Sequence, residues 1–170
     1  MIDEYDHIED TLKAFDMLNS KQLEVGIVNG DEFLSMVAWV NDVGATITAK
    51  NVPYLMIPYK QDGKLKFAKK KSVNIPARPF LERTINTKGF KWNSYFADLT
   101  QDMLEGHGNS ETIMRSMGRL MVYDMRIQIK GYIRPHNAPL TIANKGFDDT
   151  LIDTGKLLNS IDYRIARTTI

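Results

Sequence analysis

The chain has 170 residues, and its 22 lysines and arginines against 21 aspartates and glutamates give a formal net charge of +1 at pH 7. This length suits one domain, and the near-neutral charge argues against a protein that is basic over its whole surface. The absence of cysteine excludes disulfides, thiolate metal ligands and cysteine nucleophiles. The acidic start is unlike a signal peptide, and no apolar run approaches the roughly 20 residues that cross a bilayer. We therefore expect folding in a cytoplasm and no membrane contact.

Apolar spacing and turn residues predict the elements of the first half. Helical spacing of apolar side chains predicts a helix over residues 3–18, and a strand is expected over 22–28. Asp31 can cap a second helix that ends near Gly44, because glycine accepts the conformation that a helix C-cap needs. Residues 46–74 are β-rich, and the sequence Gln-Asp-Gly-Lys within them is typical of a hairpin turn.

The second half is predicted to be mainly helical. A short helix is expected over residues 80–86 and another over 92–105, with glycines after the second ending it. The longest helix of the chain is predicted over 110–131, where apolar residues recur at helical spacing. Short helical turns near Thr141 and Thr154 precede a closing strand over residues 162–166.

This order of elements predicts an α+β fold. The expected architecture is a mostly antiparallel sheet with a hairpin, packed against one long helix and several shorter helices. A single domain is expected over residues 1–170, with a projecting lysine-rich hairpin at about 54–74.

The sequence lacks the residue patterns of a catalyst or a metal site. The three histidines are far apart, whereas a zinc site needs ligands at closer spacing. Asp148, Asp149 and Asp153 form a tight acidic cluster, but they lack the order of a calcium loop. Asp153 or Thr154 is instead expected to cap the helix that follows. We expect no catalytic residue, no cofactor, no metal and no enzymatic activity.

The predicted hairpin concentrates positive charge. Its lysines are Lys60, Lys64, Lys66, Lys69, Lys70 and Lys71. Lysines on a strand edge can protect it from unwanted pairing, and they can also contact phosphates or an acidic neighbouring subunit. Phe67 is the one aromatic residue among them, so stacking on single-stranded bases is not expected. Both interpretations of the lysines stay open.

Six short motifs follow one another along the chain. They are Val25-Gly26-Ile27, Asn41-Asp42-Val43-Gly44-Ala45, Ile75-Pro76-Ala77-Arg78-Pro79-Phe80-Leu81, the Pro135–Pro139 loop, Lys145-Gly146 and Leu151-Ile152-Asp153-Thr154-Gly155. In this order and spacing they resemble the tail-completion (virion-morphogenesis) proteins of long-tailed bacteriophages. Two positions depart from that pattern: Thr150 stands where such proteins usually have proline, and Asn41-Asp42 where Glu-Phe or Glu-Tyr is common.

The resemblance implies a structural protein of the virion at the head–tail junction, the neck, which completes the tail or joins it to the head connector. It implies a ring of copies of the chain, with six as the expected number, assembled in the host cytoplasm. Head connector or adaptor proteins and tail terminator or tail tube proteins are the implied neighbours, and packaged double-stranded DNA in the channel is a further candidate. The alternative function is that of a small DNA-binding protein that uses the Lys60–Lys71 hairpin.

Proline- and glycine-rich segments suit a ring subunit, because they lose little entropy when they dock and because a head-to-tail contact closes under rotation. The hypothesised interface residues are Arg78, Pro79, Phe80, Arg134, Pro135, Asn137 and Asp153. Arg78 is expected to anchor the Pro76–Phe80 elbow, either within its own chain or against the adjacent subunit.

Overall fold

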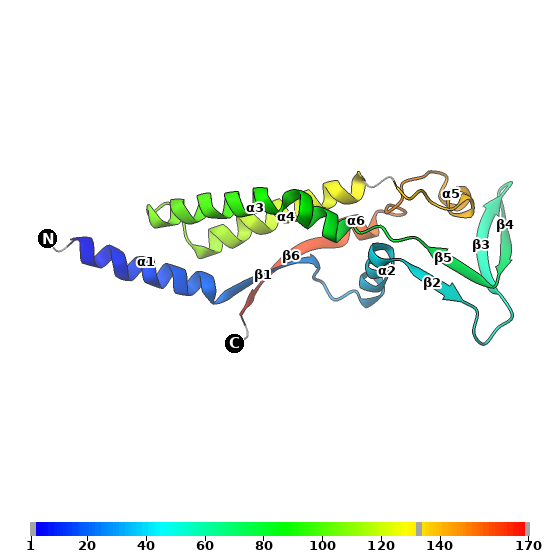
Figure 1. Ribbon diagram of the computed structural model, residues 1–170, viewed down its shortest axis with the longest axis horizontal. Helices are drawn as coiled ribbons and strands as arrows, with labels where there is room; N and C mark the ends of the chain where they lie inside the picture. Colours follow the sequence, from blue (N-terminus) through cyan, green and yellow to red (C-terminus); the bar gives the residue numbers. More distant parts are fainter. Residues whose placement is uncertain (1–2, 132–133, 169–170) are drawn as a thin grey trace. The chain divides into compact units, whose positions relative to one another are not determined.

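The protein has the α+β fold that the sequence predicts, and the computed structural model describes residues 3–131 and 134–168 (Figure 1). By its internal contacts the chain divides into two compact units, each assembled from segments that are distant in sequence. Unit 1 comprises Met1–Asn29, Thr84–Arg126 and Ser160–Ile170, and unit 2 comprises Gly30–Arg83 and Ile127–Asn159. The expectation of one domain over the whole chain stays a prediction.

The described strands pair in three separate two-stranded ladders, and all three are antiparallel. In unit 1, β1 (Lys21–Ile27) pairs with β6 (Ile161–Arg167). In unit 2, β2 (Ala45–Thr48) pairs with β5 (Ser72–Ile75), and β3 (Leu55–Gln61) pairs with β4 (Lys64–Lys70). The predicted antiparallel pairing is confirmed, and it is distributed over three ladders.

Unit 1 is held together by an apolar core. It contains α1 (Asp3–Asn19), most of α3 (Phe80–Leu104) and most of α4 (Ser110–Lys130). The buried core side chains are Leu18, Trp92, Met103, Ile113, Met114 and Met117. Leu23 of β1 and Ile165 of β6 pack against this core from the ladder. Leu23 and Ile165 are cross-strand partners, so the ladder presents this apolar pair to the helices.

Gly118 lets α4 and β6 approach closely. A Cβ atom at this position would lie 2.4 Å from Cδ2 of the Tyr163 ring, which real Cβ atoms do not tolerate. Glycine in the middle of a helix costs about 1 kcal/mol relative to alanine. Here the cost is offset by the contact between the helix backbone and the aromatic ring.

The helices predicted over 80–86 and 92–105 are one continuous helix, and this expectation was wrong. α3 has 25 residues and α4 has 21, so the helix predicted to be the longest is the second longest in the described chain. The interruption expected between the two was a stretch that contains Gly89, which lies within α3. One helical glycine costs about 1 kcal/mol, which the burial of Trp92 shortly afterwards outweighs.

Unit 2 contains three helices with clear local signals. α2 (Glu32–Val43) begins as predicted at Asp31, whose Oδ1 accepts a 2.8 Å bond from the Leu34 amide, and it ends before Gly44. α5 (Pro139–Lys145) and α6 (Lys156–Ser160) are the two short helical turns expected near residues 141 and 154.

Polar side chains are buried among the apolar ones in unit 2. Its buried apolar residues are Ala38, Phe80, Ile129, Leu151 and Leu157. Arg78, Asn137 and Thr150 are buried as well. Because a buried polar group is costly unless it is hydrogen-bonded, the packing of unit 2 depends on polar pairing as well as on apolar burial.

The hairpin predicted around Asp62-Gly63 is confirmed. Both turn residues have positive φ angles, 55° and 71°, which is the conformation of a two-residue type I′ turn. Within unit 2, α5 lies beside β3 (Figure 1). One face of the hairpin is therefore partly covered by a helix.

Candidate functional site

The motifs quoted from the sequence come together around one groove in unit 2. The groove has a volume of about 550 Å³ and is lined by residues of α2, the segment after β5, α5 and the segment before α6. Asn41, Arg78, Asn137, Lys145 and Asp153 all line it, although they lie far apart in sequence. The structure thus places five of the six motif segments in unit 2, while Val25-Gly26-Ile27 belongs to β1 of unit 1.

Arg78 joins three of these segments. Its side chain is 4% exposed, and its main-chain N–H donates to the Asn41 carbonyl at 2.8 Å. Its Nε donates to the Pro135 carbonyl at 3.1 Å, and its Nη2 donates to the His136 carbonyl at 3.3 Å. Longer contacts reach Oδ1 of Asn41 (3.4 Å) and Oδ1 of Asn137 (3.5 Å). Of the two roles expected for Arg78, this geometry accounts for the intrachain one.

The Pro135–Pro139 loop is held from its other side by Asp148 and Asp149. Oδ1 of Asp148 accepts a 3.0 Å bond from the Asn137 amide, and Oδ2 lies 2.7 Å from Nδ1 of His136. The Asn137 side-chain amide donates to the Asp149 carbonyl at 3.2 Å. The hydrogen bond from the main-chain N–H of Asn137 is the main cause that holds the pKa of Asp148 below its ordinary value, and the His136 side chain adds to it. The carboxylate of Asp148 and the main-chain carbonyl of Asp149 thus fix the loop.

Lys145, at the end of α5, ties this helix to the segment that leads to Asp153. Its Nζ donates to the main-chain carbonyls of Asp149 and Ile152. Burial lowers the pKa of Lys145, because the charged form loses solvation, and nearby Asp153 opposes the shift. A lysine with a perturbed pKa in a groove is a candidate for chemistry. Its two carbonyl partners give it a structural role that explains its position.

The seven hypothesised interface residues divide by exposure. Arg78, Phe80 and Asn137 are buried, and Pro79 is half-buried. Arg134, Pro135 and Asp153 are exposed, so these three present side chains on the surface of unit 2. The sequence pattern identified both groups but could not separate anchoring residues from surface residues. It also did not indicate the part that Lys145 and Asp148 play.

The lysines of the hairpin divide between its two faces. The register pairs Tyr59 with Lys66 and Leu55 with Lys70, so Lys64, Lys66 and Lys70 share one face. Lys60 and Lys69 lie on the opposite face, and Lys71 follows β4. Three of the six hairpin lysines therefore form a row on one face of β4.

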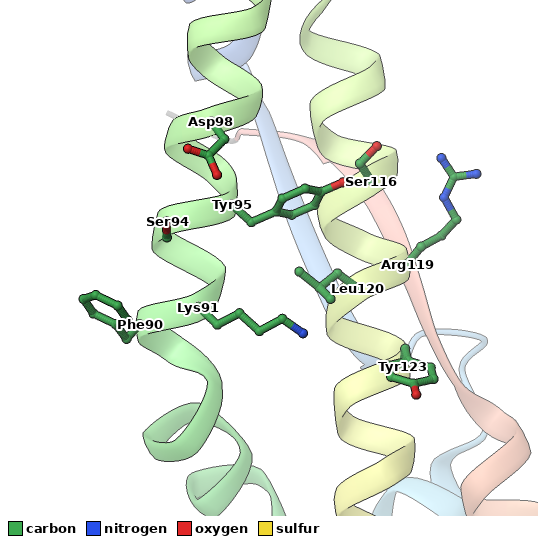
Figure 2. A pocket seen from close by; sticks show the side chains of 9 residues that line it. All are labelled: Phe90, Lys91, Ser94, Tyr95, Asp98, Ser116, Arg119, Leu120 and Tyr123. Atoms are coloured by element: carbon green, nitrogen blue, oxygen red, sulfur yellow. The ribbon is translucent and has the colours of Figure 1, made fainter.

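A second groove lies in unit 1 between α3 and α4, with a volume of about 790 Å³. Figure 2 shows Phe90 and Tyr95 of α3 and Leu120 and Tyr123 of α4 around it, with β1 and β6 passing behind the helices. Phe90 is 89% exposed. No motif pointed to this groove, because aromatic residues on a helix are read from sequence as core.

A buried carboxylate stabilises the α3–α4 pair in unit 1. Asp124 is 2% exposed, and its Oδ2 accepts a 2.9 Å bond from Trp92 Nε1. The amines of Lys88 and Lys91 lie 3.7 Å and 3.5 Å from its oxygens. The hydrogen bond and the two ion pairs compensate the burial of this carboxylate, which gives Asp124 a structural role.

Among the side chains that the structure describes, those of residues 8–131 and 134–168, no three from histidine, aspartate or glutamate come together in a way that could hold a metal ion. None of the described helices combines the length and the apolar character needed to cross a membrane. Comparisons with known protein families, with curated proteins and with solved structures found no match to this chain.

Proposed function

We propose that this protein is a structural, non-enzymatic component of a phage particle at the head–tail junction, where a ring of its copies completes the tail or joins it to the head connector. The observation that supports the proposal is the bonding around Arg78. Its guanidinium and amide link Asn41, its own Pro76–Phe80 elbow and the Pro135–Asn137 loop, which are three of the motifs that resemble tail-completion proteins. A direct bonded contact between these motifs is what a shared structural role would require.

This bonding also suits a docking surface. Arg134, Pro135 and Asp153 are exposed next to segments that Arg78 and Lys145 hold in place. A surface that is already ordered loses little conformational entropy when a neighbour binds. Exposed side chains on rigid loops are therefore suited to contacts with connector, terminator or tube proteins.

Electron microscopy of particles made without this protein tests the proposal. We expect filled heads and finished tails that remain separate, and we expect joined virions when the wild-type chain is supplied from a plasmid. Normal virions in the absence of the protein would contradict the proposal.

A second candidate function is contact with DNA, and the position of Lys64, Lys66 and Lys70 on one hairpin face favours it. Replacing these three lysines with glutamine should reduce the slope of log K against log salt by about 2.7, since each phosphate contact contributes about 0.9. Replacing Lys60 and Lys69 on the opposite face is the matched control. Electrophoretic mobility of DNA at low salt tests whether the protein binds DNA at all. If the protein does not shift the DNA band at low salt, the partner of the hairpin is a protein.

A further inference from the structure

Helix α2 carries an unusual exposed apolar surface. Phe33 is 71% exposed, Met36 52%, Trp39 64% and Val43 47%. Their spacing of three, three and four residues places them on one side of the helix, which we call the α2 stripe. Ala38 is buried on the side that packs into unit 2. A tryptophan and a phenylalanine exposed on the same side of a helix are typical of a protein–protein contact.

The β3–β4 hairpin carries a second exposed apolar surface. Met56 is 53% exposed, Leu65 61% and Phe67 53%, and Pro58 is exposed beside them. Pro58 is the cross-strand partner of Phe67, so these four side chains share one face, the hairpin face. Leu55, Ile57 and Tyr59 of β3 point to the other face and are half-buried.

The charges around the two surfaces are opposite. Asp31 and Glu32 are exposed at the start of the α2 stripe, and residues 31–43 contain no lysine or arginine. Lys60 and Lys69 flank the apolar residues of the hairpin face, because their cross-strand partners are Leu65 and Met56. Opposite charges around matching apolar patches favour binding and fix its orientation.

We infer that the α2 stripe of one copy of this chain binds the hairpin face of a second copy. Within unit 2, Figure 1 shows α2 at one end and the β3–β4 hairpin at the other, and both surfaces are exposed in the single chain. A contact between two different surfaces of identical chains is head-to-tail, and repeating it forms a ring or a filament. The inference rests on the proposed function for its biological setting, because a neck ring requires such a contact.

The size of the patches says how strong one contact is. The exposed parts of the four stripe side chains amount to on the order of 400 Å², the size of the largest apolar patch on a typical monomer. A standard interface buries about 800 Å² on each partner, so the flanking charged residues must contribute a similar area. A single contact is then weak, and closing a ring, in which every subunit makes two contacts, strengthens it.

The chain contains its own probe for this contact. Trp39 lies in the α2 stripe, whereas Trp92, the other of the two tryptophans, is 7% exposed in the core of unit 1. On association Trp39 leaves water and Trp92 does not change. Raising the concentration of the full-length protein should therefore shift the tryptophan emission to shorter wavelengths, together with a rise in mass by light scattering.

Two variants separate the surfaces. Phe67→Asp on the hairpin face and Trp39→Asp on the α2 stripe should each weaken self-association by about 30-fold or more, because each places a charge at the centre of an apolar contact. Ile85→Asp is the matched control, since Ile85 is 58% exposed on α3, outside both surfaces. Circular dichroism verifies that all three variants are folded.

Mixing the two variants tests the head-to-tail geometry. The Phe67→Asp chain retains an intact α2 stripe and its Trp39, and the Trp39→Asp chain retains an intact hairpin face. An equimolar mixture should form a dimer and shift the emission of Trp39, although neither variant does so alone. Wild-type oligomers that survive in both variants would overturn the inference while leaving the ring in place. A wild-type chain that stays monomeric at every concentration would overturn it too, whereas the neck function is decided separately by particles that lack the protein.

Discussion

Arg78→Ala is the most direct test of how unit 2 is held together. The substitution removes a buried donor from the carbonyls of Pro135 and His136, which it meets at 3.1 Å and 3.3 Å. A hydrogen bond from a charged group contributes about 1.5–3 kcal/mol, so the two bonds amount to about 3–6 kcal/mol. Removing the desolvation cost of the buried cation offsets part of this, and we expect a net loss of about 3–4 kcal/mol. That is a large fraction of the roughly 5–15 kcal/mol that stabilises a typical domain.

Urea unfolding measures the loss in the free energy of unfolding of Arg78→Ala, and hydrogen exchange shows which segments lose protection. We expect faster amide exchange in residues 74–80 and 134–157, and little change in the core of unit 1. Arg134→Ala is the matched control, because Arg134 adjoins the same loop but is exposed, and it should change the free energy of unfolding by less than about 0.5 kcal/mol. If Arg78→Ala is as stable as the wild type, the intrachain role that we assign to this side chain is wrong.

Three further substitutions test other parts of the structure. Asp148→Asn should destabilise the protein at neutral pH. The pKa of Asp148 is lowered in the folded state, so the contribution of its carboxylate to stability is lost when the group is protonated. The difference from wild type in urea unfolding should therefore vanish as the pH falls below 3.8. Gly118→Ala should lower stability by up to about 2 kcal/mol in thermal unfolding, since the clash with Tyr163 exceeds the gain in helix propensity; a raised melting temperature would contradict the close approach. Asp124→Ala should cost about 2–3 kcal/mol in urea unfolding because it removes the acceptor of the Trp92 N–H, and Asp124→Asn, which keeps an acceptor, should cost less.

The elements predicted correctly are those that depend on local chemistry. Asp31 caps α2 and Gly44 ends it, and the Asp62-Gly63 turn closes the hairpin, because these signals act within a few residues. Gly89 shows the limit of this reasoning. It lies between the two helices predicted over residues 80–86 and 92–105, but α3 continues through it, because the residues that follow pack against partners elsewhere in the chain.

The candidate site was predictable in composition but not in geometry. The sequence identified Arg78, Asn137 and Asp153 as belonging to distinctive motifs, and all three line the groove of unit 2. It did not show that Arg78 and Asn137 are buried anchors while Asp153 is exposed. That difference depends on the carbonyls of a loop more than fifty residues away, which no local pattern contains.

By itself the sequence determined the cap and end of α2, the hairpin turn, where positive charge is concentrated, and that cysteine chemistry is excluded. Only the tertiary structure decided how the strands divide into three ladders and which lysines share a hairpin face. It also decided that the apolar residues of the α2 stripe are exposed to solvent. The physical reason is that propensities, caps and turns act between near neighbours, whereas burial and exposure depend on which distant surfaces meet.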